Sequence, residues 1–282
     1  MKQLSRLLAT IAMTALISAN GMAANPLDSP EAMKALRERA AAGDLSAMYQ
    51  LGYALQNDPD QTNDLEGRDL MIEAANRGYW ISAAQLGSYY LYGWSEWAKV
   101  NEEANTAEAI RWLRRAGEMA PADADASDTY RILGHLYSHT FMRQVDFTAA
   151  PLDEAEAIRW YRLCAAAENE WCAGDLGRLL VKAPGTATEG VKWLLSAANN
   201  GNGWAMRNLA GLYTDGKTLH RDLVTALAWY RRAAAWTPAV SEGNDLVMDV
   251  NGKAEELAKQ LTPEEIQRAS DMVAQFKPKT RQ

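Results

Sequence analysis

Two short patterns alternate along this chain of 282 residues and constrain its fold more than any other feature. In the first, a small residue is followed by Leu four places later, then at once by Gly or Ala, and by an apolar residue three places further on. These offsets place all four positions on one face of an α-helix. The pattern therefore predicts five amphipathic helices. Its copies open at Ala47, Ser82, Thr129, Cys172 and Ala205.

In the second pattern, a large residue, Leu or Trp, is followed four and five places later by two small residues. The large residues recur at intervals of 33 to 36, except for two intervals of 42 and 48 that indicate inserted loops. We call the segments with the first pattern the Leu-Gly helices and those with the second the Trp helices. The large residues of the Trp helices are Leu36, Leu70, Trp112, Trp160, Trp193 and Trp229.

The alternation of the two patterns predicts stacked helix pairs. Small residues allow two antiparallel helices to approach closely, and Trp or Tyr fills the space between neighbouring pairs. A single pair cannot bury its own apolar face, so neighbouring pairs must stack. The chain is also rich in Ala, Leu, Glu and Arg, which favour helices. We therefore expect an all-α solenoid of about five to six helix pairs over residues 25–261.

The segment from Ala205 to Ala234 carries both patterns most completely, and it resembles the Sel-1-like repeat family, which is related to the tetratricopeptide repeats. The resemblance covers roughly residues 32–236 and departs from the family pattern at Ala210, where the family prefers Gly. It implies a right-handed superhelix whose Leu-Gly helices line the concave face, and a protein partner, because family members act as adaptors, regulators or immunity proteins. The matching residues are Ala205, Leu209, Tyr213, Gly216, Asp222, Ala226, Trp229, Ala233 and Ala234.

Both ends of the repeat region contain helix-capping residues. Ser29 followed by Pro30 is typical of an N-cap with Pro at the first helical position. Thr262 and Pro263 repeat this arrangement, and Glu265 is placed to complete a capping box. We predict that residues 262–276 form a final helix covering the last repeat and that the chain is frayed from Lys277 to Gln282.

The first 24 residues have the pattern of a secretory signal peptide. Lys2 and Arg6 precede an uncharged stretch over 7–19, and small residues follow, with cleavage expected after Ala23 or Ala24. The uncharged stretch is shorter than the roughly 20 residues that a bilayer span needs. The alternative is a buried first helix. We expect a periplasmic or secreted protein without membrane insertion.

The net negative charge of the chain argues against a nucleic-acid partner. Removing residues 1–24 takes away Lys2 and Arg6 and no acidic residue, so the net charge falls from −7 to −9. Nucleic-acid affinity depends on Lys and Arg that neutralise phosphates, and no dense basic cluster is present. We expect no nucleic-acid partner. The acidic balance favours a partner with positive patches, or serves solubility alone.

Cys164 and Cys172 replace small residues at neighbouring repeat positions that face the same helix pair. In an oxidising compartment two such neighbours should form a disulfide. The resemblance implies the same pairing, because cysteine-rich members of the family carry Cys eight residues apart at these positions. A redox or metal role would need a C-x-x-C motif or a nearby His.

The sequence contains none of the common catalytic motifs: no G-x-S-x-G, S-x-x-K or H-E-x-x-H and no phosphate-binding loop. His135 and His139 lie four places apart and could share a metal, but His220, the third candidate ligand, is two repeats away. We expect both to be solvent-facing. The sequence therefore predicts no enzyme, no metal and no cofactor.

Two surfaces are candidates for a partner. The first is the exposed stripe of the Leu-Gly helices, three and six places after each opening small residue; an ordinary solvated face is the alternative. The second is a pair of inserted loops, one with Tyr92, Trp94 and Trp97, the other with Phe141, Arg143 and Phe147, which could instead fold back on the core. The stripe consists of Gln50, Tyr53, Gln85, Ser88, Ile132, His135, Asp175, Arg178, Asn208 and Gly211.

Taken together, the repeats, the signal segment and the missing chemistry predict an exported protein that binds another protein or peptide. Its role could be that of an adaptor, a regulator or an inhibitor of an envelope or toxin protein. An envelope enzyme acting on cell-wall material and a structural component of an envelope assembly are the alternatives. The sequence leaves the oligomeric state open.

Overall fold

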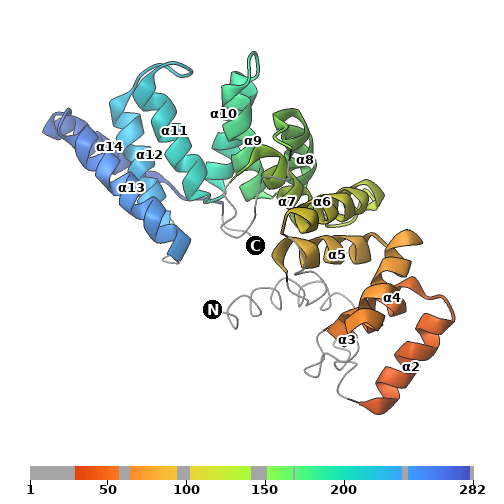
Figure 1. Cartoon of the computed structure of the whole chain (residues 1–282). Helices are drawn as coiled ribbons and strands as arrows, with labels where there is room; N and C mark the ends of the chain where they lie inside the picture. The colour runs from red at the N-terminus through yellow and green to blue at the C-terminus, as the bar shows by residue number, and fades with distance from the viewer. Residues whose placement is uncertain are drawn as a thin grey trace. The chain divides into compact units, whose positions relative to one another are not determined.

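The computed structural model describes residues 29–56, 64–93, 102–140, 151–167, 169–236 and 241–279, which leaves the predicted signal segment outside the described residues. Within these ranges the protein is all-helical, as predicted, with thirteen helices (Figure 1). The helices are α2 (Pro30–Ala41), α3 (Leu45–Gln56), α4 (Asp64–Asn76), α5 (Trp80–Tyr92), α6 (Glu102–Met119), α7 (Ser127–Ser138), α8 (Glu154–Ala166), α9 (Glu170–Lys182), α10 (Ala187–Asn199), α11 (Gly203–Asp215), α12 (Leu223–Trp236), α13 (Ser241–Ala258) and α14 (Pro263–Gln275).

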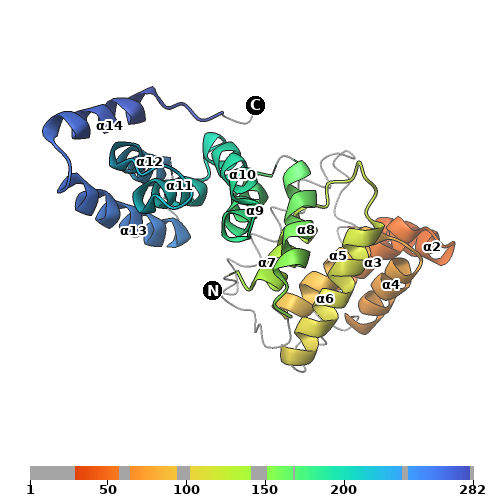
Figure 2. The same cartoon turned by 90° about the horizontal axis from the view of Figure 1, so that it is seen from above.

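The helices pack in consecutive pairs, a Leu-Gly helix followed by a Trp helix. The chain divides into two compact units, Met1–Ala120 and Pro121–Gln282. In the first unit α3 packs on α4 and α5 on α6, and α2 covers α3. In the second unit the pairs are α7 with α8, α9 with α10, and α11 with α12. Figure 2 shows α13 and α14 following α12, and both contact it.

In two of the helix pairs the backbones approach each other closely at glycine residues. A Cβ built on Gly52 of α3 would lie 2.7 Å from the carbonyl oxygen of Gly67 in α4, and one on Gly67 would lie equally close to the oxygen of Gly52. Gly177 of α9 and Gly190 of α10 are related in the same way, at 2.8 Å. The backbones therefore touch where the sequence pattern places its small residues, and any side chain there would push the helices apart.

In two further pairs, α5 with α6 and α7 with α8, a large side chain covers the glycine. Gly134 of α7 lies under the ring of Tyr161, where an added Cβ would come within 2.4 Å of a ring carbon. Gly87 of α5 is covered by Leu113 in the same way, at 2.5 Å. Tyr161 and its neighbour Trp160 are fully buried. Of the six large residues that recur in the Trp helices, Leu36, Trp112, Trp160 and Trp229 are buried in the core, whereas Leu70 and Trp193 are half-buried.

Capping at the two ends follows the sequence. The side chain of Ser29 accepts a hydrogen bond from the Ala32 N–H at 3.0 Å and Pro30 begins α2. Thr262 and Glu265 form a reciprocal capping box at the start of α14.

The chain after α14 is tied down as far as the structure describes it. The ring of Phe276 packs edge-on against Trp229 at 5.8 Å, and the Arg232 guanidinium lies 4.5 Å from the centre of each ring. The Lys279 N–H donates to the carbonyl oxygen of Asn199 at 2.8 Å. Fraying of the last residues stays a prediction, and residues 280–282 lie outside the described residues.

The Gly177–Gly190 contact predicts a steric cost. We expect Gly177→Ala to lower the free energy of unfolding by about 1–3 kcal/mol, because its Cβ would meet backbone that cannot move aside. Gly252→Ala is the control: an added Cβ there has nothing within 4 Å. The control should be neutral or should stabilise by up to about 1 kcal/mol. Urea unfolding measures both, and equal effects would contradict the close approach.

Asp222 makes the start of α12 sensitive to pH. Its Oδ1 accepts from the N–H groups of Val224 and Thr225, both at 3.0 Å, and its Oδ2 from the Thr225 hydroxyl at 2.7 Å. Partial burial alone would raise the pKa of Asp222, but these hydrogen bonds outweigh it and hold the pKa below the ordinary 3.8. The ionised carboxylate therefore stabilises the fold above about pH 4, and this contribution is lost as the pH falls through the lowered pKa.

We expect Asp222→Asn to cost about 0.5 kcal/mol of unfolding free energy near neutral pH, because the amide keeps one acceptor and loses the charge. The difference from the parent protein should shrink as the pH falls through the lowered pKa of Asp222, where the parent carboxylate becomes protonated. Thermal unfolding at a series of pH values tests this, and a difference that grows in acid would contradict it.

Candidate functional site

In the first unit, the predicted stripe forms mainly local interactions. Gln50 is exposed, and its side-chain amide donates to the Ser46 hydroxyl at 3.2 Å. Tyr53 is half-buried, with its ring centre 6.3 Å from that of Tyr49 in the same helix. Gln85 is half-buried, and so is Ser88, whose hydroxyl donates to the Ala84 carbonyl.

In the second unit, three residues of the predicted stripe meet. His135 Nε2 of α7 lies 3.0 Å from Asp175 Oδ2 of α9. Arg178 Nη2, one turn further along α9, lies 3.5 Å from the other carboxylate oxygen of Asp175. The His135 side chain is only 14% exposed, so the expectation that it faces solvent is wrong. Its cover comes from Asp175 in the next repeat and from the Tyr161 ring of α8, whose centre lies 5.8 Å away, and a single-helix pattern does not contain that information.

Three hydroxyl groups extend this network away from Asp175. Arg178 Nη2 donates to the Thr140 hydroxyl at 2.7 Å, and the Ser138 hydroxyl lies 2.6 Å from Thr140 and 3.2 Å from the Tyr161 phenol. Burial raises the pKa of Tyr161 far above its ordinary value, and the nearby Asp175 raises it further. Tyr161 is therefore a neutral hydrogen-bonding group. The network joins α7, α8 and α9 and fixes the orientation of the Arg178 side chain.

A second ionic cluster lies on α11 and α13. Arg207 Nε is 2.5 Å from Asp249 Oδ2, and Lys253 Nζ is 2.6 Å from Asp249 Oδ1. Partial burial alone would raise the pKa of Asp249, but its bonds to Lys253 and Arg207 hold it below the ordinary value. The predicted stripe residues Asn208 and Gly211 lie beside this cluster on α11 and are half-buried, as is Ile132 on α7.

The pattern search missed two exposed tryptophans. Trp171 of α9 is 48% exposed and Trp204 of α11 is 43% exposed. Each directly precedes the small residue that opens its repeat. Each also lies four and seven places before two stripe positions, so Trp171 shares a helix face with Asp175 and Arg178. The sequence marks these two positions as equivalent only by the 33-residue interval between them. The pattern does not include this position, because the other copies have Ser46, Ile81 and Asp128 there.

Two contacts place the first turns of α7, α9 and α11 next to one another. Cys164 forms a disulfide with Cys172, Cα to Cα 5.7 Å, and its sulfur lies 3.2 Å from the carbonyl oxygen of Ser127 at the start of α7. Asn202, which caps α11, donates from its side-chain amide to the Glu170 carbonyl in the first turn of α9, at 3.2 Å.

The residues next to these ties are Asp128, Trp171 and Trp204, which we call the first-turn row. Asp128 follows Ser127, Trp171 lies between Glu170 and Cys172, and Trp204 is two places after Asn202. All three are exposed. The row therefore runs across three consecutive Leu-Gly helices at their N-terminal ends.

Some predicted sites cannot be placed. Trp94, Trp97, Phe141, Arg143 and Phe147 lie outside the described residues. Tyr92, at the end of α5, is half-buried. His139 is exposed and ends α7 with a left-handed backbone (φ 47°). Among the described residues no group of three or more His, Cys, Asp or Glu side chains is arranged to hold a metal ion.

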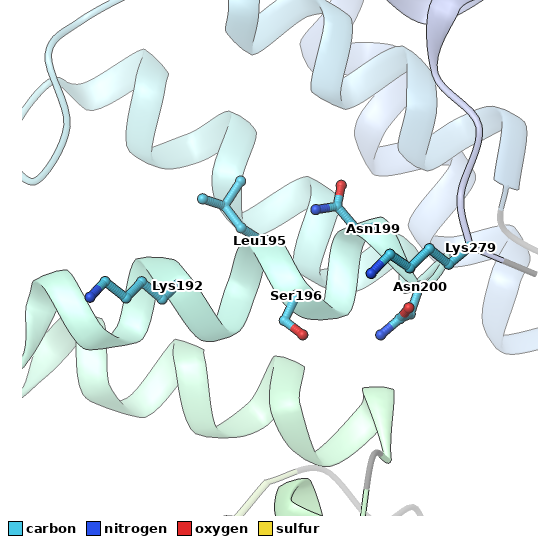
Figure 3. Close-up of a pocket in the computed structure, with 6 residues that line it drawn as sticks. All are labelled: Lys192, Leu195, Ser196, Asn199, Asn200 and Lys279. Atoms are coloured by element: carbon cyan, nitrogen blue, oxygen red, sulfur yellow. The ribbon is translucent and has the colours of Figure 1, made fainter.

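A shallow pocket lies elsewhere, on a Trp helix (Figure 3). Its lining comes from α10, from the residue that caps this helix and from the segment after α14. The residues are Lys192, Leu195, Ser196 and Asn199 of α10, the cap Asn200, and Lys279. It shares no residue with the first-turn row or the polar network. Of the helices described, none has the length and apolar character needed to cross a membrane.

Comparison with known families gives a repeat match over much of the chain. The family described as Sel1 repeat matches residues 45–79, 80–121, 148–169, 187–202 and 205–235. These segments include most of α3 to α6, α8, α10, α11 and α12. A search of curated protein sequences found no significant match.

Solved structures share the architecture. A Sel1 repeat protein from Oxalobacter formigenes is 22% identical with a TM-score of 0.61, and the match covers 89% of this chain and 95% of that one. A protective antigen of uropathogenic Escherichia coli with an SLR fold is 22% identical with a TM-score of 0.59. That match covers 87% of this chain and 48% of the antigen, so the chain spans about half of the antigen's length. At this identity the likeness shows the fold alone.

An immunity protein from Pseudomonas aeruginosa is also similar, at 18% identity over 77% of this chain and 82% of that one. Its TM-score is 0.33, which is too low to support an argument about fold or function.

The His135–Asp175–Arg178 contacts predict a structural cost. We expect Asp175→Asn to lower the free energy of unfolding by about 1–3 kcal/mol, because it leaves the half-buried side chains of His135 and Arg178 without their carboxylate partner. Asp123→Asn, at an exposed position, should change it by less than about 0.5 kcal/mol. Chemical denaturation compares the two variants. Equal and negligible losses would show that the network does not join α7 to α9 in solution.

Proposed function

This chain belongs to the Sel1 repeat family, and we propose that it is an exported protein-binding module whose partner docks on the Leu-Gly helices of the second unit. The observation that carries the proposal is the exposure of Trp171 and Trp204 at equivalent places in two consecutive repeats. Tryptophan is usually well buried, and an exposed pair on one surface is unfavourable in water without a further role. Trp is also the residue type most enriched among binding hot spots.

The surroundings of the two rings support this docking surface. Asp175 and Arg178 follow Trp171 along the same helix face, and their side chains are fixed by the contacts to His135 and Thr140. A partner would therefore meet two large apolar rings beside polar groups that are already oriented. Such a surface loses little conformational entropy on binding.

Export is supported by two independent features. The Cys164–Cys172 disulfide is the form expected in an oxidising compartment. The basic, apolar and small-residue segments of residues 1–24 have the order of a secretory signal. We infer a periplasmic or secreted location from the two together.

Binding, rather than catalysis, is the function that this geometry supports. Asp175 orients His135 as a carboxylate orients a catalytic base, but no described hydroxyl or thiol is hydrogen-bonded to His135. The hydroxyls of Ser138 and Thr140 instead bond to each other, to Tyr161 and to Arg178. A nucleophile activated by a base requires the hydrogen bond that this network lacks.

Site-specific photo-crosslinking in the producing cells tests the proposal. A photoreactive side chain at Asn208, between the Trp204 and Gly211 positions on α11, should capture one dominant protein. Changing both Trp171 and Trp204 to Ala should remove that product, because hot-spot truncations typically weaken binding by about tenfold or more. Mass spectrometry of the crosslinked band identifies the partner.

Two controls make the result specific. A photoreactive side chain at Leu163, which is 42% exposed on α8, should not capture the same protein. Trp236→Ala, which removes a tryptophan of similar exposure (41%) from α12, should leave the crosslink intact. Capture from both positions, or no loss in the double variant, would overturn the proposed surface. A product present in fixed amount under all growth conditions would favour the structural-component alternative.

A further inference from the structure

We propose that the first-turn row binds a basic segment of the partner, with an arginine or lysine side chain lying over Trp171 and near Asp128 and the rest of the segment crossing Trp204. This inference rests on the proposed function, since it specifies the chemistry of a protein partner at the same surface. It follows from the placement of charge and aromatic rings at the N-terminal ends of α7, α9 and α11.

The first step is the alignment of the three helix ends. The contact of Cys164 with Ser127 and the disulfide to Cys172 connect the start of α7 to the start of α9. The bond from Asn202 to Glu170 connects the start of α9 to that of α11. Because each tie lies within two residues of a row member, an extended segment crossing the three helices can meet Asp128, Trp171 and Trp204 in order.

The second step is the charge at the α7 end of the row. Asp123, Asp125 and Asp128 are exposed within six residues of the chain. The basic residue nearest in sequence to this group is Arg131, which lies 3.4 Å from Asp128 and so offsets one of the three charges. A row with this excess of negative charge attracts cations and repels anions.

The third step is the chemistry of the rings. The face of an indole ring attracts a guanidinium or ammonium group, and Arg is used for this contact more often than Lys. The protein itself contains one example at the row: the Arg207 guanidinium carbon lies 5.9 Å from the centre of the Trp204 ring. Asp249 is shared by Arg207 at 2.5 Å and Lys253 at 2.6 Å, so the α11 end of the row carries one net positive charge. A cation is therefore favoured over Trp171, nearer the acidic α7 end, while Trp204 offers mainly an apolar ring.

These observations favour a basic segment over the other occupants of an exposed aromatic surface. An acidic segment would meet like charges at Asp123, Asp125 and Asp128. A purely apolar helix would gain from the two rings but would have to lie beside exposed carboxylates, which costs free energy if they lose water. A basic segment satisfies both parts of the surface.

Titration of the full chain with short peptides tests the proposal. The probes are a synthetic peptide of alternating Arg and Ser and its counterpart with Glu in place of Arg. The readout is the indole N–H signals of Trp171 and Trp204 in two-dimensional NMR spectra, assigned with Trp171→Phe and Trp204→Phe. We expect the Arg peptide to shift these two signals, the Glu peptide to shift neither, and the response to weaken with added salt.

Charge variants separate the row from the net charge of the protein. The double variant Asp123→Asn/Asp128→Asn removes two negative charges at the row and should weaken Arg-peptide binding by about threefold or more. Glu255→Gln/Glu256→Gln removes the same charge from exposed positions on α13 and should leave binding unchanged. Thermal unfolding of both variants checks that each is folded.

The outcomes are distinguishable. If the Arg peptide shifts neither signal, binds with equal affinity to both charge variants, or behaves like the Glu peptide, the basic-segment proposal is overturned. A tryptophan-dependent crosslink from Asn208 would then still uphold the proposed function, with a partner of other chemistry. If that crosslink is absent while the Arg peptide shifts both signals and loses affinity with the row charges, the surface binds basic peptides and the docking of a cellular partner is what fails.

Discussion

The close approach of two helices at the glycine of the Leu-Gly helix, which occurs in four of the five described pairs, is the constraint on which the rest of the structure depends. At Gly52 with Gly67, and at Gly177 with Gly190, each glycine leaves no room for a Cβ on the other. The pair can close only if both helices carry a small residue at the crossing point. The remaining interior is then filled by the large residues of the Trp helices, which lie on the same helix faces as these small positions. Helix spacing is therefore set by glycine, and the core volume by Trp, Tyr and Leu.

This close packing also determines what the exposed side chains can reach. With the pairs closed, the stacking of one repeat on the next brings consecutive Leu-Gly helices within side-chain reach, as the contact of His135 with Asp175 shows over a separation of 40 residues. The same stacking allows Asn202 to cap α11 and bind the backbone of α9 at once. Short polar side chains thus join neighbouring repeats at the surface, while apolar ones join them inside. The first-turn row is a consequence of this register.

Much of the fold could be predicted because helical periodicity is a local property. The copies of the two patterns predicted the paired helices, and the capping residues at Ser29 and Thr262 begin helices where expected. The second glycine of each close contact, Gly67 or Gly190, was missed because the other copies have Ala or, in the first, Met33 at that position. His135 was assigned to solvent because its cover comes from other helices, from Tyr161 of α8 and Asp175 of α9. Residues whose environment is made by another repeat cannot be assigned from the pattern of one helix.

Trp171 and Trp204 were not predicted because the repeat pattern does not constrain the position that they occupy. That lack of constraint bears on function. The position before each opening small residue is occupied by Ser46, Ile81, Asp128, Trp171 and Trp204 in the five copies, so the helix pair itself places no demand on it. A position that the scaffold leaves unconstrained, and that is exposed, gains nothing in solubility from an indole ring. Two successive tryptophans there are not explained by the packing that explains the buried Trp112 and Trp160. Residues that depart from the repeat without serving the fold are therefore the better guide to a binding surface than residues that recur in every copy.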